Sequence, residues 1–391
     1  MYYKIINRKK KIATIIADII GHTLWAPLNL FRAKNKRLAR KEIKEILVIR
    51  TAYVGDVVMT MPMLKPLKET YPHARITFLT GTVSKELLLD NPYVDSVITY
   101  DAFWFYPKAR KKDYLKFLKT LRSRSYDLTI EARGDIRDLL FLVYMSRSMY
   151  RMSFNVGGGG FLLTHVVPFD RALKHRVDVH MDIIKFLGGK PGEIDWGLHP
   201  TMDEVQRAES LIGKHEGGLI IGVHAGGRKG LKCWSSERYS ELVRHISKEI
   251  GAKVVFTGYV EEKELICEII KKAGCEAVNL AGSTDMRTLV ALIGAFDAFI
   301  TNDSAPLHIA SAMGTPTVAI FGPSKSKETG PYGNIHRVVE KDFLCRFTCD
   351  EDVCNRGGSK QCMEDVLVDD VFTALQEVIE EAGKSKSFML N

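Results

Sequence analysis

The 391-residue sequence lacks several patterns that identify common classes of protein. It contains no short-period internal repeat and no low-complexity tract, so it is neither a repeat array nor a compositionally biased chain. The G-x-x-x-x-G-K-[ST] spacing of a Walker loop is absent, which excludes that mode of phosphate binding. No paired C-x-x-C motif is present, which argues against a zinc ribbon. The seven cysteines do not require an oxidising compartment.

Excess positive charge is also missing from most of the chain. The net charge is +9, but residues 1–44 contain twelve Lys or Arg and only two acids, Asp18 and Glu42, which gives this segment +10 and leaves −1 for the rest. A hydrophobic content of 46% and a charged content of 26% are typical of a soluble globular protein. A chain of this length is expected to form two domains. The basicity therefore belongs to an N-terminal arm and not to the globular body.

The arm contains an apolar segment that is a poor candidate for a spanning helix. Thirteen of the twenty residues 12–31 are apolar, but Asp18 and Pro27 interrupt them, and no small-x-small cleavage site of a signal peptide follows. The polar residues recur at helical spacing and gather on one narrow face: Thr14, Asp18, Gly21 and His22. Basic clusters on both sides of this helix predict that it lies on an anionic membrane surface. The alternative is a helix packed against its own protein, with a solvated basic flank.

From Glu45 onward, strand-like and helix-like segments alternate. The first series has strand-like segments at 45–51, 74–80, 95–100 and 126–132, with helix-like segments at 57–71, 111–123 and 135–147. After a Gly- and Pro-containing segment at 188–200, a second series has strand-like segments at 218–226, 252–258, 276–282, 297–303 and 315–322. This alternation predicts two doubly wound α/β domains with parallel sheets, whose strand ends face a ligand-binding cleft. The domain boundaries that we expect are 1–44 for the arm, 45–190, a linker at 191–201, 202–365, and 366–391 for a last helix and tail.

The first candidate site residue is Asp56, which follows the first predicted strand. In "RTAYVGDVVMTMP" (50–62) the chain turns from strand to helix at Gly55-Asp56. One interpretation makes Asp56 the N-cap of the helix, because Asp is a favoured capping residue. The other makes it a general base, a carboxylate that takes a proton from an attacking hydroxyl.

Two segments of the second domain have the composition of an anion site. "HAGGRKGLKCW" (224–234) places Gly226 and Gly227, which let backbone N–H groups approach a phosphate, before the cation Lys232. In "TNDSAPLHIASAMG" (301–314), a strand ends at Asp303 and a helix begins at Ser304. The N–H groups and dipole of that helix start would attract a pyrophosphate.

The polar residues of this helix start have ordinary explanations as well. Ser304 and Pro306 are good residues for beginning a helix. Asp303 would compete with a phosphate for the same donors, so it would instead orient Lys232 or accept a sugar hydroxyl. His308 would donate to a phosphate or a sugar, or it is an ordinary buried helix histidine.

Together these residues resemble glycosyltransferase family 9, the heptosyltransferases. The resemblance rests on Gly55-Asp56 with Pro62, Lys232-Cys233-Trp234, "LAG" (280–282), "TNDSAPLHIASAMGTP" (301–316) and "FGPS" (321–324). It runs in order from about Ile46 to Val371. It implies a GT-B fold, two Rossmann-like domains with the active site between them, and inverting transfer of heptose from ADP-heptose to the lipopolysaccharide inner core. It also implies that no bound metal or other cofactor is required.

The resemblance assigns roles by position. It makes Asp56 the catalytic base, Lys232 the lysine that meets the donor phosphates, and Asp303 the residue that holds the heptose. The remaining donor-binding residues that it implies are Gly226, Gly227, Ser304, Ala305 and His308. Ala305 departs from the family, where Gly is frequent. "IEARGDIRD" (130–138) also departs from an Asp-x-Gln-Gly-like stretch, so Arg133 and Arg137 are candidates for the acceptor side, although exposed arginines at a helix start are more often solvated.

Four cysteines cluster in the sequence near the C-terminus. Cys345, Cys349, Cys354 and Cys362 are separated by three, four and seven residues, which is not the spacing of a zinc ribbon. They are weak metal candidates, and a loop with free thiols or a disulfide is the favoured interpretation.

The sequence therefore predicts an inverting glycosyltransferase that uses ADP-heptose and a membrane-borne saccharide acceptor of the lipopolysaccharide-core kind. We expect it in the cytoplasm, held peripherally on the inner face of the membrane by residues 1–44, with no nucleic-acid partner, because the arm lacks interleaved aromatic residues. The alternatives are the same fold with another nucleotide-sugar and a non-catalytic membrane adaptor.

Overall fold

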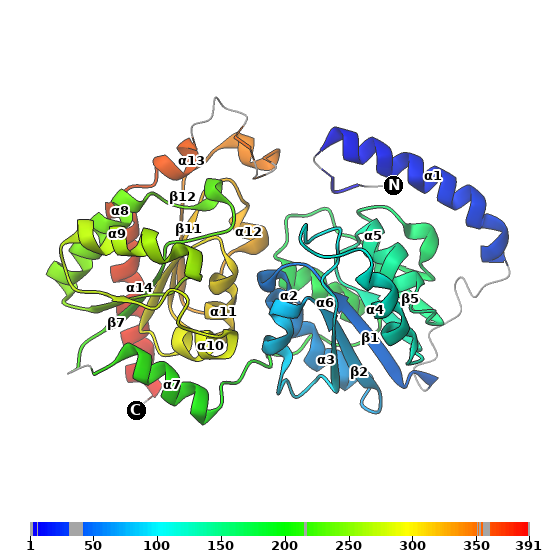
Figure 1. Cartoon of the computed structure of the whole chain (residues 1–391), viewed down its shortest axis with the longest axis horizontal. Helices are drawn as coiled ribbons and strands as arrows, with labels where there is room; N and C mark the ends of the chain where they lie inside the picture. The colour runs from blue at the N-terminus through cyan, green and yellow to red at the C-terminus, as the bar shows by residue number, and fades with distance from the viewer. Residues whose placement is uncertain are drawn as a thin grey trace. The chain divides into compact units, whose positions relative to one another are not determined.

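The computed structural model describes residues 3–5, 7–30, 42–214, 217–349, 351, 353–354 and 360–389. The chain divides into two compact units, Met1–Gly197 and Leu198–Asn391. Both units are α/β, as the alternation of strands and helices predicted (Figure 1). The second basic cluster of the arm falls in residues 31–41 and lies outside the described residues.

The N-terminal unit is built on a six-stranded sheet in the order β3-β2-β1-β4-β5-β6, and every pair of neighbouring strands is parallel. Its strands are β1 (Glu45–Arg50), β2 (Arg75–Thr80), β3 (Ser96–Thr99), β4 (Leu128–Glu131), β5 (Tyr150–Phe154) and β6 (His165–Val167). Its helices are α1 (Arg8–Leu30), α2 (Val54–Thr60), α3 (Leu64–Thr70), α4 (Asp113–Arg122), α5 (Ile136–Asp138) and α6 (Arg176–Phe186). Helix α5 continues as a π-helical turn, η4 (Leu139–Tyr144), and a short 3-10 turn, η5 (Gly160–Leu162), precedes β6.

The C-terminal unit repeats this topology in the order β12-β11-β10-β7-β8-β9, again with all neighbours parallel. Its strands are β7 (Ile220–His224), β8 (Lys253–Phe256), β9 (Val278–Asn279), β10 (Ala298–Asn302), β11 (Thr317–Phe321) and β12 (His336–Glu340). Its helices are α7 (Met202–Ile212), α8 (Ser236–His245), α9 (Lys263–Ala273), α10 (Met286–Gly294), α11 (Ala305–Met313), α12 (Ser326–Thr329), α13 (Gln361–Glu364) and α14 (Val368–Met389).

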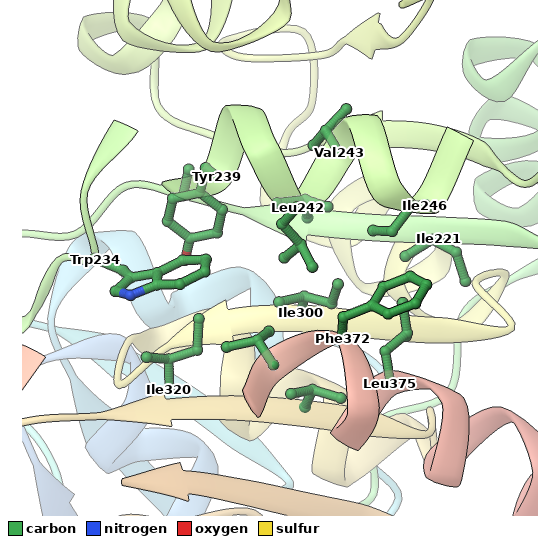
Figure 2. Packing of buried hydrophobic residues seen from close by; sticks show 14 of the residues in the cluster. Ile221, Trp234, Tyr239, Leu242, Val243, Ile246, Ile300, Ile320, Phe372 and Leu375 are labelled. Carbon is green, nitrogen blue, oxygen red and sulfur yellow. The ribbon is translucent and has the colours of Figure 1, made fainter. Parts of the chain in front are cut away.

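The central strands are apolar because helices cover both faces of each sheet. In β1, β10 and β11 every residue but the first of β1 is buried, as expected for parallel strands. In the C-terminal unit, Leu242 of α8 faces Ile300 of β10, the Tyr239 ring of α8 packs against Trp234, and α14 adds Phe372 and Leu375 to the same cluster (Figure 2). The last helix is thus part of the core of this unit.

Polar residues fix the helix starts. Thr201 and Glu204 form a capping box at α7, and Asp285 accepts a hydrogen bond from the Thr288 N–H at α10 (2.6 Å). Asp135 accepts one from the Arg137 N–H at α5 (2.9 Å). In the described part of the chain, no helix combines the length and apolarity that crossing a bilayer requires.

Candidate functional site

Each sheet has one topological switch point, where the chain changes direction across the sheet. In the N-terminal unit it lies between β1 and β4, and in the C-terminal unit between β7 and β10. Ligands of open α/β sheets bind beyond the carboxyl ends of the strands at such points. Asp56 and Arg133 follow β1 and β4, while Gly226 and Asp303 follow β7 and β10. The candidates from sequence therefore fall at the two switch points.

Asp56 lies in the first turn of α2, but it does not cap that helix. The N-cap residue is Tyr53, whose positive φ of 46° turns the chain out of β1, and no side chain caps the helix start. The capping interpretation of Asp56 is therefore wrong. Its carboxylate instead pairs with the guanidinium of Arg50, with 2.7 Å between Oδ1 and Nη2. Among the described residues, Oδ2 has no hydrogen-bond donor, and the side chain is 25% exposed.

The surroundings of Asp56 keep it ionised. Burial acts to raise the pKa of this carboxyl, but the positive charges of Arg50, Arg133 and Arg176 outweigh burial and hold the pKa below its ordinary value. Arg50 is only 6% exposed, and its Nε and Nη1 atoms are buried without hydrogen-bond partners among the described residues. Asp56 is thus a partly exposed carboxylate surrounded by positive charge.

Arg133 and Arg137 occupy different environments. Both guanidinium groups lie over the ring of Phe105, at 4.6 and 4.7 Å from its centroid. Arg137 also forms an ion pair with Asp135 (2.7 Å), whereas Nη1 of Arg133 is buried without a partner among the described residues. The structure therefore brings Arg133 to the Asp56 site and engages Arg137 with its own helix start.

A buried carboxylate holds the turn that carries Arg133. Glu131 is fully buried and accepts hydrogen bonds from the N–H groups of Arg133 (3.1 Å) and Gly134 (2.5 Å) and from the Ser153 hydroxyl (2.6 Å). Burial raises its pKa. Burial, together with the charges of Glu131 and Asp135, also raises the pKa of Asp138 to about 8.

In the C-terminal unit, Asn302 organises the switch point. This fully buried residue ends β10, and its Nδ2 donates to the carbonyls of Ala225 (2.9 Å) and Gly226 (3.1 Å). Its Oδ1 accepts from the Trp234 N–H (3.1 Å) and the Tyr239 hydroxyl (3.0 Å). The side chain thus anchors both ends of the loop that contains Lys232 to the strand that leads to Asp303.

Lys232 lies between two carboxylates. Its Nζ is 2.6 Å from Oδ2 of Asp303 and 2.8 Å from Oε2 of Glu351, and Lys229 lies 3.6 Å from the same oxygen of Glu351. Burial acts to lower the pKa of Lys232, but Asp303 and Glu351 raise it above its ordinary value. The ammonium group is therefore charged and held at the end of β10, and Asp303 orients it, as one interpretation predicted.

The remaining donor-side candidates surround the start of α11. Ser304 occupies the N-cap position, but its hydroxyl does not cap the helix and lies 3.1 Å from the hydroxyl of Thr301. Ala305 and Pro306 form the first turn, and His308 is buried one turn later. The prediction that the helix begins at Ser304, with Pro306 in its first turn, is confirmed, although no side chain caps this helix start.

The two glycines approach neighbouring side chains closely. A Cβ on Gly226 would lie 1.9 Å from Oε1 of Glu262, so a larger residue would displace that carboxylate. A Cβ on Gly227 would lie 3.0 Å from Sγ of Cys233. A larger residue at either position would therefore shift a neighbouring side chain, whether or not a ligand is bound.

The cysteine cluster does not form a metal centre among the residues that the structure describes. None of the seven cysteines, all of which the structure describes, forms a disulfide, so the disulfide alternative is not realised. Within the same described set, no three His, Cys, Asp or Glu side chains converge in a way that could hold a metal ion. The structure assigns no role to the four clustered cysteines, Cys345, Cys349, Cys354 and Cys362.

Sequence reasoning missed residues that shape both sites. Arg50 and Arg176 act on Asp56, and Asn302 and Glu351 act on the Lys232 region. Arg50 could have been found from sequence, because it is a charged residue directly after the apolar run of its strand. Nothing in the sequence indicated that Glu351 would reach Lys232.

Comparisons with known proteins agree with these observations. The chain is 28% identical over 354 residues to lipopolysaccharide heptosyltransferase 3 of Escherichia coli (strain K12), over 85% of this chain and 97% of the relative. It is 27% identical over 303 residues to the lipopolysaccharide core heptosyltransferase OpsX of Haemophilus influenzae, over 76% of this chain and 84% of the relative.

A solved structure shows the fold. The E. coli ADP-heptose lipopolysaccharide heptosyltransferase II superimposes with a TM-score of 0.69 at 23% identity, over 86% of this chain and 99% of the other. This likeness confirms the predicted GT-B fold class. The model of a family described as glycosyltransferase family 9 (heptosyltransferase) matches residues 114–355, which is more than half of the chain. This protein therefore belongs to glycosyltransferase family 9 and is a glycosyltransferase.

Proposed function

We propose that this protein transfers heptose, with inversion, from ADP-heptose to a saccharide acceptor of the lipopolysaccharide core or a related membrane-borne glycan. The observation that carries the proposal is the oriented, charged Lys232 beside Asp303 at the start of α11, in a chain whose relatives are named as lipopolysaccharide heptosyltransferases. The reaction takes place at the cytoplasmic face of the membrane, because the donor is a soluble nucleotide-sugar and the acceptor is membrane-borne.

The C-terminal unit binds the donor. Lys232 meets the diphosphate as a point charge, and the uncapped N–H groups at the start of α11 donate to the phosphate oxygens. As the bond between the anomeric carbon and the diphosphate oxygen breaks, negative charge grows on the departing ADP, and these groups stabilise it. The carboxylate of Asp303 accepts hydrogen bonds from hydroxyl groups of the heptose, in addition to its ion pair with Lys232.

The N-terminal unit supplies the base. The acceptor hydroxyl attacks the anomeric carbon from the face opposite the diphosphate, its oxygen forms the new glycosidic bond, and its proton passes to Oδ2 of Asp56. Because Arg50 occupies Oδ1, Oδ2 is the oxygen that is open to substrate. A low pKa makes Asp56 a modest base, but it keeps the carboxylate ionised at neutral pH.

Arg133 is the acceptor-side residue that we propose. Its buried, unpartnered Nη1 would be satisfied by an oxygen of an anionic acceptor group. Arg137 already pairs with Asp135, so it supports the site instead of binding the acceptor. The proposal uses no bound metal or other cofactor, and full activity after treatment with EDTA is the expected result.

The donor assignment is tested by calorimetry with ADP, UDP and GDP. We expect ADP to bind most tightly and Lys232→Met to weaken its binding at least tenfold. Lys272→Met is a matched control, because Lys272 forms an exposed ion pair with Glu237 in the same unit. Equal affinities for the three nucleotides would contradict ADP-heptose as the donor and favour another nucleotide-sugar.

The base is tested by transfer assays with ADP-heptose and lipopolysaccharide-core acceptors. Asp56→Asn should lower kcat roughly 10²–10⁴-fold and leave ADP affinity unchanged. Asp113→Asn removes an exposed carboxylate of α4 in the same unit and should have no effect. Turnover of Asp56→Asn at the native rate would remove Asp56 as the base, and binding of ADP without any transfer by the native chain would favour the adaptor alternative.

A further inference from the structure

The N-terminal helix α1 packs against its own unit through its polar face. The carboxylate of Asp18 is 2% exposed and accepts hydrogen bonds from the Gly159 N–H (2.6 Å) and the Tyr3 hydroxyl (2.7 Å). A buried carboxylate must be satisfied by such donors, so these bonds fix the rotation of α1 about its own axis. The interpretation of a helix packed on its own protein is thus confirmed for α1.

Small residues bring the same face of α1 close to the unit. A Cβ on Gly21 would lie 2.2 Å from the ring of Phe161, and a Cβ on Gly158 would lie 2.4 Å from Cγ2 of Thr14. Thr14, Asp18 and Gly21 follow helical spacing, so they lie on one side of α1. The helix is therefore seated on the segment around η5 and does not hang from the unit as a loose arm.

The opposite side of α1 is apolar and exposed. Its side chains form one stripe over about three turns, which we call the apolar stripe: Ile12 (49% exposed), Ile16 (52%), Ile19 (62%), Ile20 (52%) and Leu24 (62%). A surface helix ordinarily turns such a stripe toward the core. Here the arrangement is reversed: the side chains of the stripe are exposed, although α1 itself lies along the N-terminal unit (Figure 1).

The charges of α1 indicate what covers the apolar stripe. The residues 8–11, Arg-Lys-Lys-Lys, are all exposed at the start of the helix. Cations at a helix N-terminus oppose the helix dipole, so they do not stabilise the helix itself. Asp18 is the one acid in the sequence of α1, and it is buried. The exposed surface of α1 thus combines apolar side chains with positive charge alone, which matches anionic headgroups above acyl chains.

We propose that α1 is a docking helix that lies in the plane of an anionic lipid surface, with the apolar stripe inserted and the Asp18 face holding the N-terminal unit. Because α1 is seated on that unit, membrane binding fixes the orientation of the unit toward the lipid and does not merely tether it. The inference is independent of the sugar-transfer proposal, since it uses none of the site residues.

The apolar stripe is tested by co-sedimentation of the full chain with vesicles. The native chain should bind vesicles that contain phosphatidylglycerol, and the triple variant Ile16→Gln/Ile19→Gln/Ile20→Gln should bind them at least tenfold more weakly. Leu115→Gln/Met149→Gln is the matched control, because these side chains are 68% and 58% exposed elsewhere on the same unit. Thermal unfolding should be unchanged in both variants, since every altered side chain is exposed.

The charge contribution is tested separately. Lys9→Gln/Lys10→Gln/Lys11→Gln should weaken binding to phosphatidylglycerol vesicles by about fivefold for each cation near the surface and leave binding to phosphatidylcholine vesicles unchanged. The seating of α1 on its unit is tested with Gly21→Leu, which forces α1 off Phe161. This variant should expose the arm to trypsin in the absence of vesicles, while its binding to vesicles persists.

Three results would overturn the proposal. The first is that the triple Ile variant binds vesicles as tightly as the native chain. The second is that the native chain prefers neutral vesicles. The third is that the native chain binds no vesicles but forms a dimer, whereas the triple variant is monomeric, which would make the apolar stripe a self-association surface.

Discussion

Replacing Asn302 by Asp tests the idea that one buried amide organises the donor side. The two residues have the same shape, and the Oδ1 atom can still accept from the Trp234 N–H and the Tyr239 hydroxyl. The second oxygen, however, cannot donate to the carbonyls of Ala225 and Gly226 as Nδ2 does at 2.9 and 3.1 Å. The variant therefore removes two hydrogen bonds and places a carboxyl group against two carbonyl oxygens.

The size of the effect follows from burial. Asn302 is fully buried, so no water replaces the lost donors. Each lost bond costs about 1 kcal/mol, and each carbonyl left unsatisfied adds about 1 kcal/mol or more. We expect the free energy of unfolding of the C-terminal unit to fall by at least ~3 kcal/mol, a large part of the ~5–15 kcal/mol of a typical domain.

The measurement is urea unfolding followed by tryptophan fluorescence, together with calorimetric binding of ADP. Because Asn302 anchors the loop that contains Lys232, ADP affinity of the folded variant should fall about tenfold as well. Asn279→Asp is the control: this less buried amide donates to the Lys263 carbonyl at 3.2 Å, and its loss should cost less than about 1 kcal/mol. A loss below 1 kcal/mol for Asn302→Asp, with native ADP affinity, would refute the anchoring role.

Three further changes have defined outcomes. Glu351→Gln should tighten ADP binding roughly tenfold in calorimetry, because a carboxylate that competes with phosphate for Lys232 is neutralised; unchanged or weaker binding would contradict this. The raised pKa of Asp138, about 8, means that the folded state keeps a proton that the unfolded state has lost, so the free energy of unfolding should fall as pH rises from about 4 to about 8; Asp138→Asn should flatten this dependence in denaturant titrations. The lowered pKa of Asp56 means that the unliganded protein keeps this carboxylate ionised down to about pH 4, so kcat/KM of transfer should stay level from neutral pH to about pH 4; an acid limb near pH 6 would assign the base elsewhere.

The fold was predictable because its strongest signals are local. Buried parallel strands have continuous apolar runs, as in β1 and β10, and the helices between them have clear starts. The strands β5, β6 and β12 were not predicted. β6 has three residues, and every residue of β12 but one is only partly buried, so neither produces a long apolar run.

The candidate site was predictable as far as its residues follow strand ends. Asp56, Lys232 and Asp303 were identified from turns of the chain that local sequence shows. The residues that pair with them were not identified, because these ion pairs and charge interactions connect positions that are distant in the sequence or depend on the fold. The ion pair between Lys232 and Glu351 joins residues 119 positions apart, and the buried Arg50 acts on Asp56 through the fold. The orientation of α1 also required the structure, since helical periodicity identifies two faces but not which one docks.

The arrangement around Lys232 has a consequence for donor binding. One ammonium group faces two carboxylates, so the group is already neutralised, and an arriving diphosphate must displace one of them to gain a bond. Asp303 is 7% exposed and directly follows β10, where Asn302 anchors the strand end, so its carboxylate is held in place. Glu351 is 30% exposed, so its carboxylate is the more accessible of the two to an arriving ligand. If Lys232 binds the donor as proposed, Glu351 is the carboxylate that we expect to yield, while Asp303 remains to orient Lys232 on the diphosphate.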